Sequence, residues 1–140
     1  MIRSPLSLER VAYCSRAVRP ELALVTLAEI LAVSDRNNRR DNLTGMLLIS
    51  RGRFFQVLEG AAQDVERMLE RIGRDPRHTH LSVVMRRPVK DRLFGQWAMV
   101  AARITPRQQP TIDQVIDNCH DDPDLAVHSA LELLRAQLAG

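Results

Sequence analysis

Two apolar runs separated by a two-residue connection constrain the fold of this chain more than any other feature. Residues 43–50 read LTGMLLIS, and residues 53–60 read RFFQVLEG, with Arg51-Gly52 between them. Runs of this length around a short connection that contains glycine predict a β-hairpin. The chain must therefore build a sheet around this hairpin.

The second run of the hairpin contains one residue that does not suit a buried strand. Phe54, Gln56 and Leu58 would share one face, and Phe55 and Val57 would share the other. Both faces are otherwise apolar, so we expect both sides of the sheet to be covered. A buried carboxamide without a partner costs about 1–3 kcal/mol. Gln56 therefore predicts a hydrogen-bond partner on its own face of the sheet.

Alternating and helical patterns predict the remaining elements. Residues 8–14, 81–88 and 96–104 are typical of strands. A helix is expected from Pro20, with an apolar stripe that includes Ile30 and continues to Ser34, and the polar run DRNNRRDN ends it. Further helices are expected at residues 61–75, 111–118 and 122–138.

The order β-α-β-β-α-β-β predicts an α+β fold, a ferredoxin-like sandwich with its first two helices on one sheet face. The extra strand would extend one edge, and the C-terminal helices would cover the other face. We expect residues 1–105 to form the domain core and residues 106–140 to form an extension packed on the sheet.

Tyr13 is the single tyrosine of the chain and the candidate partner of Gln56. In this fold we expect the strands at residues 8–14 and 53–59 to be a central parallel pair, which makes the two side chains neighbours. A buried hydrogen bond between them would either stabilise the core only or form part of a binding site.

Composition limits the classes of function. With 140 residues, 45% hydrophobic and 26% charged, the chain is expected to be one globular domain. It has no apolar stretch of membrane-spanning length and no signal-peptide pattern at its start, which predicts a cytoplasmic protein without a membrane partner. The net charge is +3, but the arginines are scattered and few aromatic residues accompany them, so we expect no nucleic-acid binding.

The sequence spacing of cysteine and histidine predicts no metal site. Cys14 and Cys119 are far apart in the sequence and are expected to be reduced thiols. His78 and His80 form an H-x-H pair without a recognisable third or fourth ligand.

Five segments, in this order, resemble the BLUF family of blue-light sensors that use a flavin. They are AYCSRA, SDRNNRRDNLTG, FFQVLEG, RDPRH and FGQWAM, and together they cover about residues 8–104. The spacing N-x-x-x-x-LTG and the motif FFQ-x-LEG carry most of the specificity.

The resemblance implies a flavin, FAD or alternatively FMN, bound without a covalent bond between the first two helices. Gln56 would lie between the Tyr13 hydroxyl and the flavin, and Asn38 would contact the flavin pyrimidine edge. The full set of implied cofactor-binding residues is Ile30, Ser34, Asn37, Asn38, Phe54, Gln56, Asp75, Arg77 and His78. Leu47 could wrap the ring as well.

Each of these residues also has an ordinary structural interpretation. Asn38 could cap a helix, Leu47 could belong to the core, and the RDPRH segment could be a solvated loop. Trp97 and Met99 share a face of their strand; the resemblance implies that they relay the signal, although a tryptophan and a methionine on a strand also suit a core.

The implied function is blue-light sensing rather than enzymatic catalysis. Light would drive electron and proton transfer from Tyr13 to the flavin and leave Gln56 with rearranged hydrogen bonds, which shifts absorption to the red. The output would reach an unidentified effector protein, or alter self-association as a homodimer. The alternative is a light-insensitive ferredoxin-like module that binds a ligand or a protein. An acylphosphatase-like hydrolase is disfavoured because CSRAVRP lacks the glycines of a phosphate loop.

Overall fold

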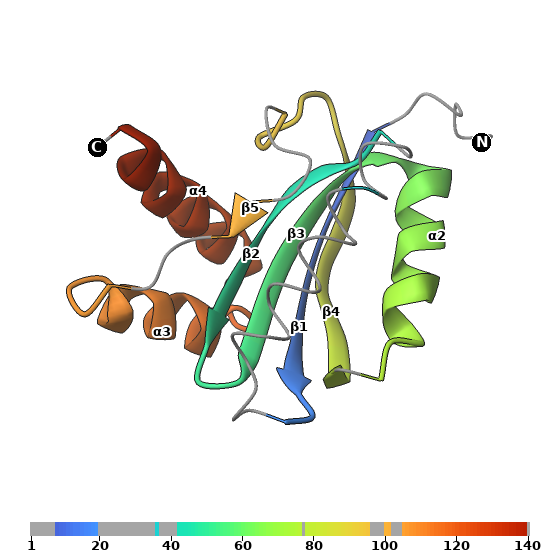
Figure 1. Ribbon diagram of the computed structural model, residues 1–140. Helices are drawn as coiled ribbons and strands as arrows, with labels where there is room; N and C mark the ends of the chain where they lie inside the picture. Colours follow the sequence, from blue (N-terminus) through green and yellow to red (C-terminus); the bar gives the residue numbers. More distant parts are fainter. Residues whose placement is uncertain are drawn as a thin grey trace.

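One sheet with helices on both sides organises the chain in the computed structural model, which describes residues 8–19, 36, 42–76, 78–95, 100–101 and 105–139. In chain order the elements are β1 (Leu8–Ala17), β2 (Thr44–Ser50), β3 (Arg53–Ala61), α2 (Ala62–Gly73), β4 (His78–Val89), β5 (Val100–Ala101), α3 (Gln109–Asn118) and α4 (Pro123–Ala139) (Figure 1). The helix expected from Pro20 and most of the strand expected at residues 96–104 lie outside the described residues.

The strands lie in the order β4-β1-β3-β2-β5. This order confirms the α+β, ferredoxin-like prediction, with the additional strand β5 at the edge beside β2. The expectation of a parallel central pair is wrong, because β1 and β3 are antiparallel. The physical reason is the hairpin: β3 runs opposite to β2, and because β3 also runs opposite to β1, it is β2 that is parallel to β1.

The hairpin connection has the backbone that its sequence predicts. Arg51 has φ 53° and Gly52 has φ 75°. Positive φ at both central residues is typical of a type I′ turn, whose twist matches that of the two flanking strands. The Gly52 carbonyl also accepts a hydrogen bond from the Ala17 amide at 2.7 Å, which joins the turn to the end of β1.

Helices cover both faces of the sheet, as the two apolar faces of β3 predict. On one face α2 packs through Val65 and Met68 against Val11, Tyr13 and Leu58. On the other face α3 and α4 form a larger core with the sheet, and Figure 1 shows these two helices on the side opposite α2. The strand residues of that core are Ala12, Cys14, Met46, Leu48, Phe55 and Val57. Among the described residues, no helix is long and apolar enough to cross a membrane.

The prediction that both cysteines are reduced thiols is wrong for this structure. Cys14 of β1 and Cys119 at the end of α3 form a disulfide, and no described cysteine is free. They are 105 residues apart in sequence. They meet because α3 packs on the sheet face to which Cys14 points.

Candidate functional site

Tyr13 and Gln56 lie directly opposite each other on β1 and β3. Tyr13 belongs to the cluster that packs against α2, and Gln56 shares its face because it alternates with Leu58 of the same cluster. Only 2% of Tyr13 and 4% of Gln56 are exposed, so this is a buried phenol beside a buried carboxamide. The prediction that the two residues are neighbours is confirmed.

Three apolar side chains surround this polar pair on the same face of the sheet. Leu47 is the β2 partner of Gln56, and Ile49 is the partner of Phe54. All three apolar residues, Leu47, Ile49 and Phe54, are buried. The site therefore consists of an apolar wall with one phenol and one amide set into it.

Electrostatics keep the Tyr13 phenol neutral. Burial raises the pKa of Tyr13 well above its ordinary value, and the negative charge of Asp75 raises the pKa further. Asp75 follows α2, where its amide donates to the Ile72 carbonyl oxygen at 3.0 Å. A neutral phenol can donate a hydrogen bond to a carboxamide oxygen, and a phenol that loses an electron readily releases this proton.

The structure places some of the other predicted site residues. Phe54 is buried on β3 beside Gln56, Asp75 follows α2, and His78 is the first residue of β4. The remaining predicted residues lie outside the described part of the chain: Ile30, Ser34, Asn37, Asn38, Arg77, Trp97 and Met99.

Sequence reasoning did not single out Glu59, which is completely buried at the end of the same motif. Its carboxylate accepts hydrogen bonds from Arg10 Nε at 2.8 Å and from the amides of Leu93 and Phe94 at 2.8 and 2.7 Å. These amides belong to the segment that precedes Trp97 in the sequence. The sequence signal that could have identified Glu59 is a carboxylate at the end of an apolar strand, because such a group requires partners when it is buried.

Taken together, these features define an α+β domain with a buried tyrosine–amide pair on one helix-covered face of an antiparallel sheet. The chain matches the family model described as sensors of blue-light using FAD over residues 8–100, and it belongs to this BLUF family.

Two curated relatives are photoactivated adenylate cyclases. The chain is 34% identical over 99 residues to the beta subunit from Euglena longa, covering 70% of this chain and 12% of that protein. It is 34% identical over 98 residues to the alpha subunit from Euglena gracilis, covering 69% of this chain and 10% of that protein. Since the chain spans about a tenth of the length of these relatives, the match does not carry over their cyclase activity.

Solved structures share the fold. The dark-state structure of BlrB, a BLUF protein, superposes with a TM-score of 0.77 at 23% identity, covering 94% of this chain and 99% of that chain. A bacterial light-regulated adenylyl cyclase gives 0.69 at 34% identity, covering 81% of this chain and 35% of that chain. Klebsiella pneumoniae BlrP1, solved with FMN and cyclic diGMP, gives a TM-score of 0.64 at 25% identity, covering 83% of this chain and 35% of that chain.

The described residues fit the flavin that this family binds. A flavin ring is planar and largely apolar, with hydrogen-bonding atoms along one edge. The apolar wall of Leu47, Ile49 and Phe54 suits the body of the ring, and the buried amide of Gln56 can both donate to and accept from its edge.

Proposed function

We propose that this chain is a blue-light photoreceptor in which Tyr13 and Gln56 form the photochemical switch. The observation that carries the proposal is the direct pairing of these two buried side chains across β1 and β3. A phenol and a carboxamide held opposite each other on two central strands can exchange a hydrogen bond without movement of the backbone.

When bound, a flavin absorbs blue light and becomes a strong oxidant in its excited state. Tyr13 supplies the electron, and its phenolic proton becomes acidic and leaves toward the Gln56 side chain. Gln56 can rotate or change tautomer, because each end of a carboxamide can take part in hydrogen bonding. After the electron and proton return to Tyr13, the changed Gln56 arrangement constitutes the lit state, a second arrangement of the same network.

We assign FAD as the preferred cofactor because the family description names FAD. The similar protein BlrP1 was solved with FMN, so FMN is the alternative. The remaining cofactor contacts are proposed from the family motifs: Ile30, Ser34, Asn37, Asn38, Phe54, Asp75, Arg77 and His78. Arginine suits a phosphate group because its planar guanidinium binds oxygen pairs.

We propose that the signal leaves through Trp97 and Met99 toward the C-terminal helices. Residues 1–105 would act as the sensor and residues 106–140 as the responding extension. In support, α3 and α4 pack on the sheet face opposite the Tyr13–Gln56 pair. We propose an effector protein as the receiver of the signal, and a change in self-association as a homodimer as the alternative output. Sedimentation in dark and light distinguishes the two.

Absorption spectra of the purified protein, in the dark and directly after blue illumination, test this function. A flavin band that shifts to the red and recovers in darkness is expected. Tyr13→Phe and Gln56→Leu should retain the flavin and lose the shift. The matched control is Gln63→Leu, an exposed position on α2, which should shift as the wild type does. Mass spectrometry of the released flavin identifies FAD or FMN.

Two outcomes would contradict the proposal. A colourless protein that takes up neither flavin on reconstitution would favour the light-insensitive binding module. A yellow Gln56→Leu variant with an undiminished shift would remove Gln56 from the switch.

A further inference from the structure

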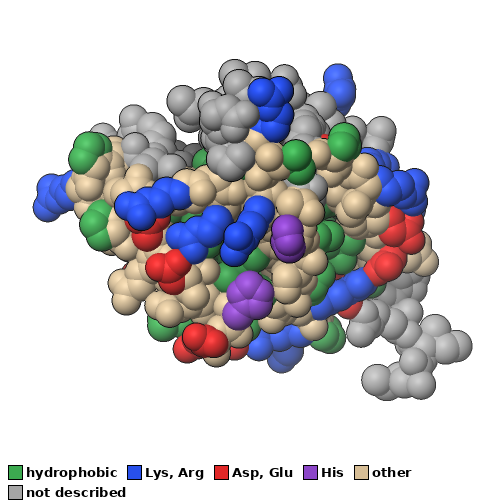
Figure 2. All heavy atoms as spheres, turned by 90° about the horizontal axis from the view of Figure 1, so that it is seen from below, with side chains coloured by type: hydrophobic (Ala, Val, Ile, Leu, Met, Phe, Trp, Pro, Cys, Tyr) green, Lys and Arg blue, Asp and Glu red, His purple; other side chains and the backbone are tan. Residues whose placement is uncertain are grey.

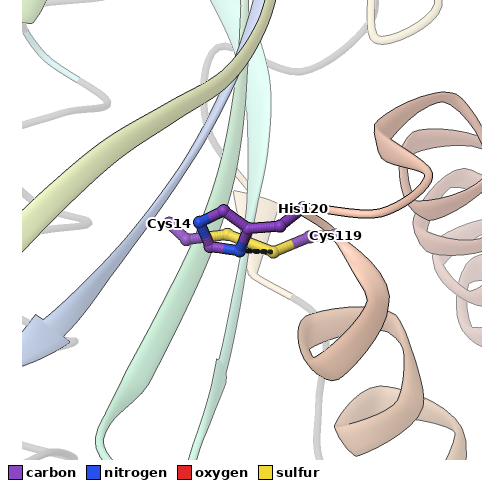
Figure 3. A group of neighbouring side chains, drawn as sticks. All are labelled: Cys14, Cys119 and His120. Atoms are coloured by element: carbon purple, nitrogen blue, oxygen red, sulfur yellow. Dashed lines mark hydrogen bonds between the residues drawn. A yellow bond between two sulfur atoms is a disulfide. The ribbon is translucent and has the colours of Figure 1, made fainter.

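A cluster of two cysteines and one histidine lies on the sheet face opposite the Tyr13–Gln56 pair. Cys14 comes from β1, and Cys119 and His120 come from the turn between α3 and α4 (Figure 3). The two sulfurs and one imidazole nitrogen all lie within 4.8 Å of one another. Such sulfur and nitrogen donors are the ligands that zinc-class ions prefer in proteins.

We propose that this cluster, when its disulfide is reduced, is a binding site for a divalent zinc-class ion. Cys14 Sγ, Cys119 Sγ and His120 Nδ1 are the three protein ligands, and water supplies the fourth. The three ligands are not among the residues proposed to hold the flavin, although Phe54 of the proposed flavin site also lines the neighbouring pocket.

The spacing of the donor atoms agrees with tetrahedral coordination. With ordinary metal–sulfur and metal–nitrogen bond lengths, a sulfur and a nitrogen on one zinc ion lie about 3.6 Å apart. The distance from Cys119 Sγ to His120 Nδ1 is 3.6 Å. The Cα atoms of Cys14 and Cys119 are 7.7 Å apart. This separation exceeds the usual disulfide span of about 4.4–6.8 Å, so the two reduced side chains have room for an ion between them.

A hydrogen bond on the far side of the ring orients the histidine. His120 Nε2 lies 3.3 Å from Ser82 Oγ of β4. In the tautomer that carries its proton on Nε2, the ring donates to Ser82, and the lone pair of Nδ1 faces Cys119 Sγ. Metal-binding histidines in general hold their second nitrogen in this way.

A pocket of about 460 Å³ gives solvent access to the cluster. Its lining includes all three proposed ligands together with Arg16, Arg53 and His80. Figure 2 shows Lys or Arg and His side chains together on the face seen from below, with hydrophobic side chains between them. Cys14 and Cys119 are buried, whereas His120 is exposed, so an ion would enter on the histidine side.

Reduction precedes binding. Two equivalents of a small thiol break the Cys14–Cys119 bond and deliver two electrons and two protons, which leaves two protein thiols and the oxidised disulfide of the small thiol. Metal binding then displaces the two thiol protons to solvent. The bound ion would hold the α3–α4 turn to β1 in place of the disulfide.

Metal titration of the full chain, kept in the dark, tests the site. The protein is reduced anaerobically with a trialkylphosphine, which becomes the phosphine oxide, and is then freed of reductant. After incubation with Zn²⁺ and gel filtration, elemental analysis should find about one zinc per reduced chain, and none above background in the oxidised chain. Co²⁺ in place of Zn²⁺ should produce thiolate charge-transfer absorption in difference spectra.

Variants separate the ligands from the surrounding protein. Cys14→Ser and Cys119→Ser should abolish the charge-transfer band, and His120→Gln should weaken affinity by more than the about 10- to 100-fold typical of an outer partner. His128→Gln is the matched control. This exposed histidine on α4 contacts the Asp124 carbonyl oxygen at 2.9 Å and lies outside the cluster.

Two results would overturn the proposal. One is zinc retention by the reduced wild type that does not exceed retention by its oxidised form. This comparison needs no mutation, so misfolding of a variant cannot obscure it. The other is unchanged cobalt absorption after either cysteine is replaced.

Discussion

Glu59 shows how a charged side chain is accommodated inside this sheet. Both carboxylate oxygens accept hydrogen bonds, from the Arg10 guanidinium and from two backbone amides of the loop after β4. Arg92 also donates to the Glu59 carbonyl oxygen at 3.1 Å. One residue thereby fixes the start of the chain segment that leads to Trp97.

Replacement of Glu59 by alanine should destabilise the protein strongly. Arg10, itself only 7% exposed, would keep a buried charge without its carboxylate, and loss of one member of a buried pair costs about 3–5 kcal/mol. Urea unfolding measures this change. Glu66→Ala is the control, because the side chain of Glu66 is 53% exposed in its pair with Arg86 and should contribute at most about 1 kcal/mol. Equal losses in the two variants would contradict the assignment.

The Tyr13 phenol should resist deprotonation in the folded protein. Its pKa is raised by burial and by Asp75, so it should stay neutral at pH values where a free tyrosine, with a pKa of 10.0, ionises. The unfolded chain loses this proton first, so the stabilisation is complete below the unfolded pKa and declines as pH rises above it.

Since Tyr13 is the only tyrosine of the chain, an alkaline absorption titration reports on this residue alone. Tyrosinate absorption in the native protein should appear only when the protein unfolds, or at a pH well above the pH at which the tyrosine of the urea-unfolded chain titrates. Superposable titrations of the native and unfolded protein would show that Tyr13 is not buried in solution.

At the scale of elements, α3 is attached to the β2–β3 hairpin by polar contacts around Asp113. Its Oδ1 accepts from Ser50 Oγ at 2.5 Å and from Gln109 Nε2 at 3.0 Å. The Ser50 hydrogen bond is the main cause that lowers the pKa of Asp113. Burial, the next largest effect, raises it, and the Gln109 hydrogen bond and the charges of Arg51 and Arg53 lower it further. The end of the hairpin therefore binds the ionised form of Asp113, and this contact holds α3 against the hairpin.

The contact between α3 and the hairpin should weaken in acid. A lowered pKa in the folded state contributes stability above the ordinary aspartate value of 3.8, and this contribution is lost as pH falls through that value toward the folded pKa. Asp113→Asn should therefore lose less stability than the wild type between about pH 6 and about pH 3. Urea midpoints at the two pH values provide the comparison. Equal acid sensitivity of both proteins would show that Asp113 does not contribute.

Local sequence patterns predicted which helices and strands form better than they predicted the relative directions of the strands. The hairpin, α2 and the two C-terminal helices follow from residues close in sequence, such as Val65 and Met68 or the glycine of the turn. The direction of β3 against β1 depends on the order in which the strands pair in the sheet, and no single strand pattern contains that order. His78 to His80 extend β4 at its start without apolar alternation, so the pattern predicted a strand only from residue 81.

The candidate site shows the same limit. Tyr13 and Gln56 could be paired from the sequence because the fold places their strands side by side. Cys14, Cys119 and His120 could not, because their proximity depends on how the α3–α4 turn lies on the sheet. The sequence spacing of these three residues does not indicate that packing.

At the scale of the whole molecule, the Cys14–Cys119 disulfide should stabilise the fold by linking the sheet to the C-terminal helices. Closing so long a stretch of chain restricts the unfolded state, and reduction should lower the free energy of unfolding by about 2–4 kcal/mol. Urea unfolding with and without reductant measures this, with a chelator present so that bound metal cannot replace the link. The Cys14→Ser/Cys119→Ser double variant should be insensitive to reductant, and an equally insensitive wild type would contradict the prediction.

The position of β1 between β4 and β3 has a consequence for how such a chain can change during evolution. Tyr13 and Cys14 are consecutive residues that face opposite sides of one strand, opposite Gln56 and Phe55 of β3. A one-residue slip moves every side chain of a strand to the other face. A single insertion or deletion within β1 would therefore disrupt the Tyr13–Gln56 pair and the cysteine cluster together. Point substitutions can alter the Tyr13–Gln56 pair without altering the cysteine cluster, or the reverse. The two sites can therefore diverge in chemistry, but both require the same length of β1.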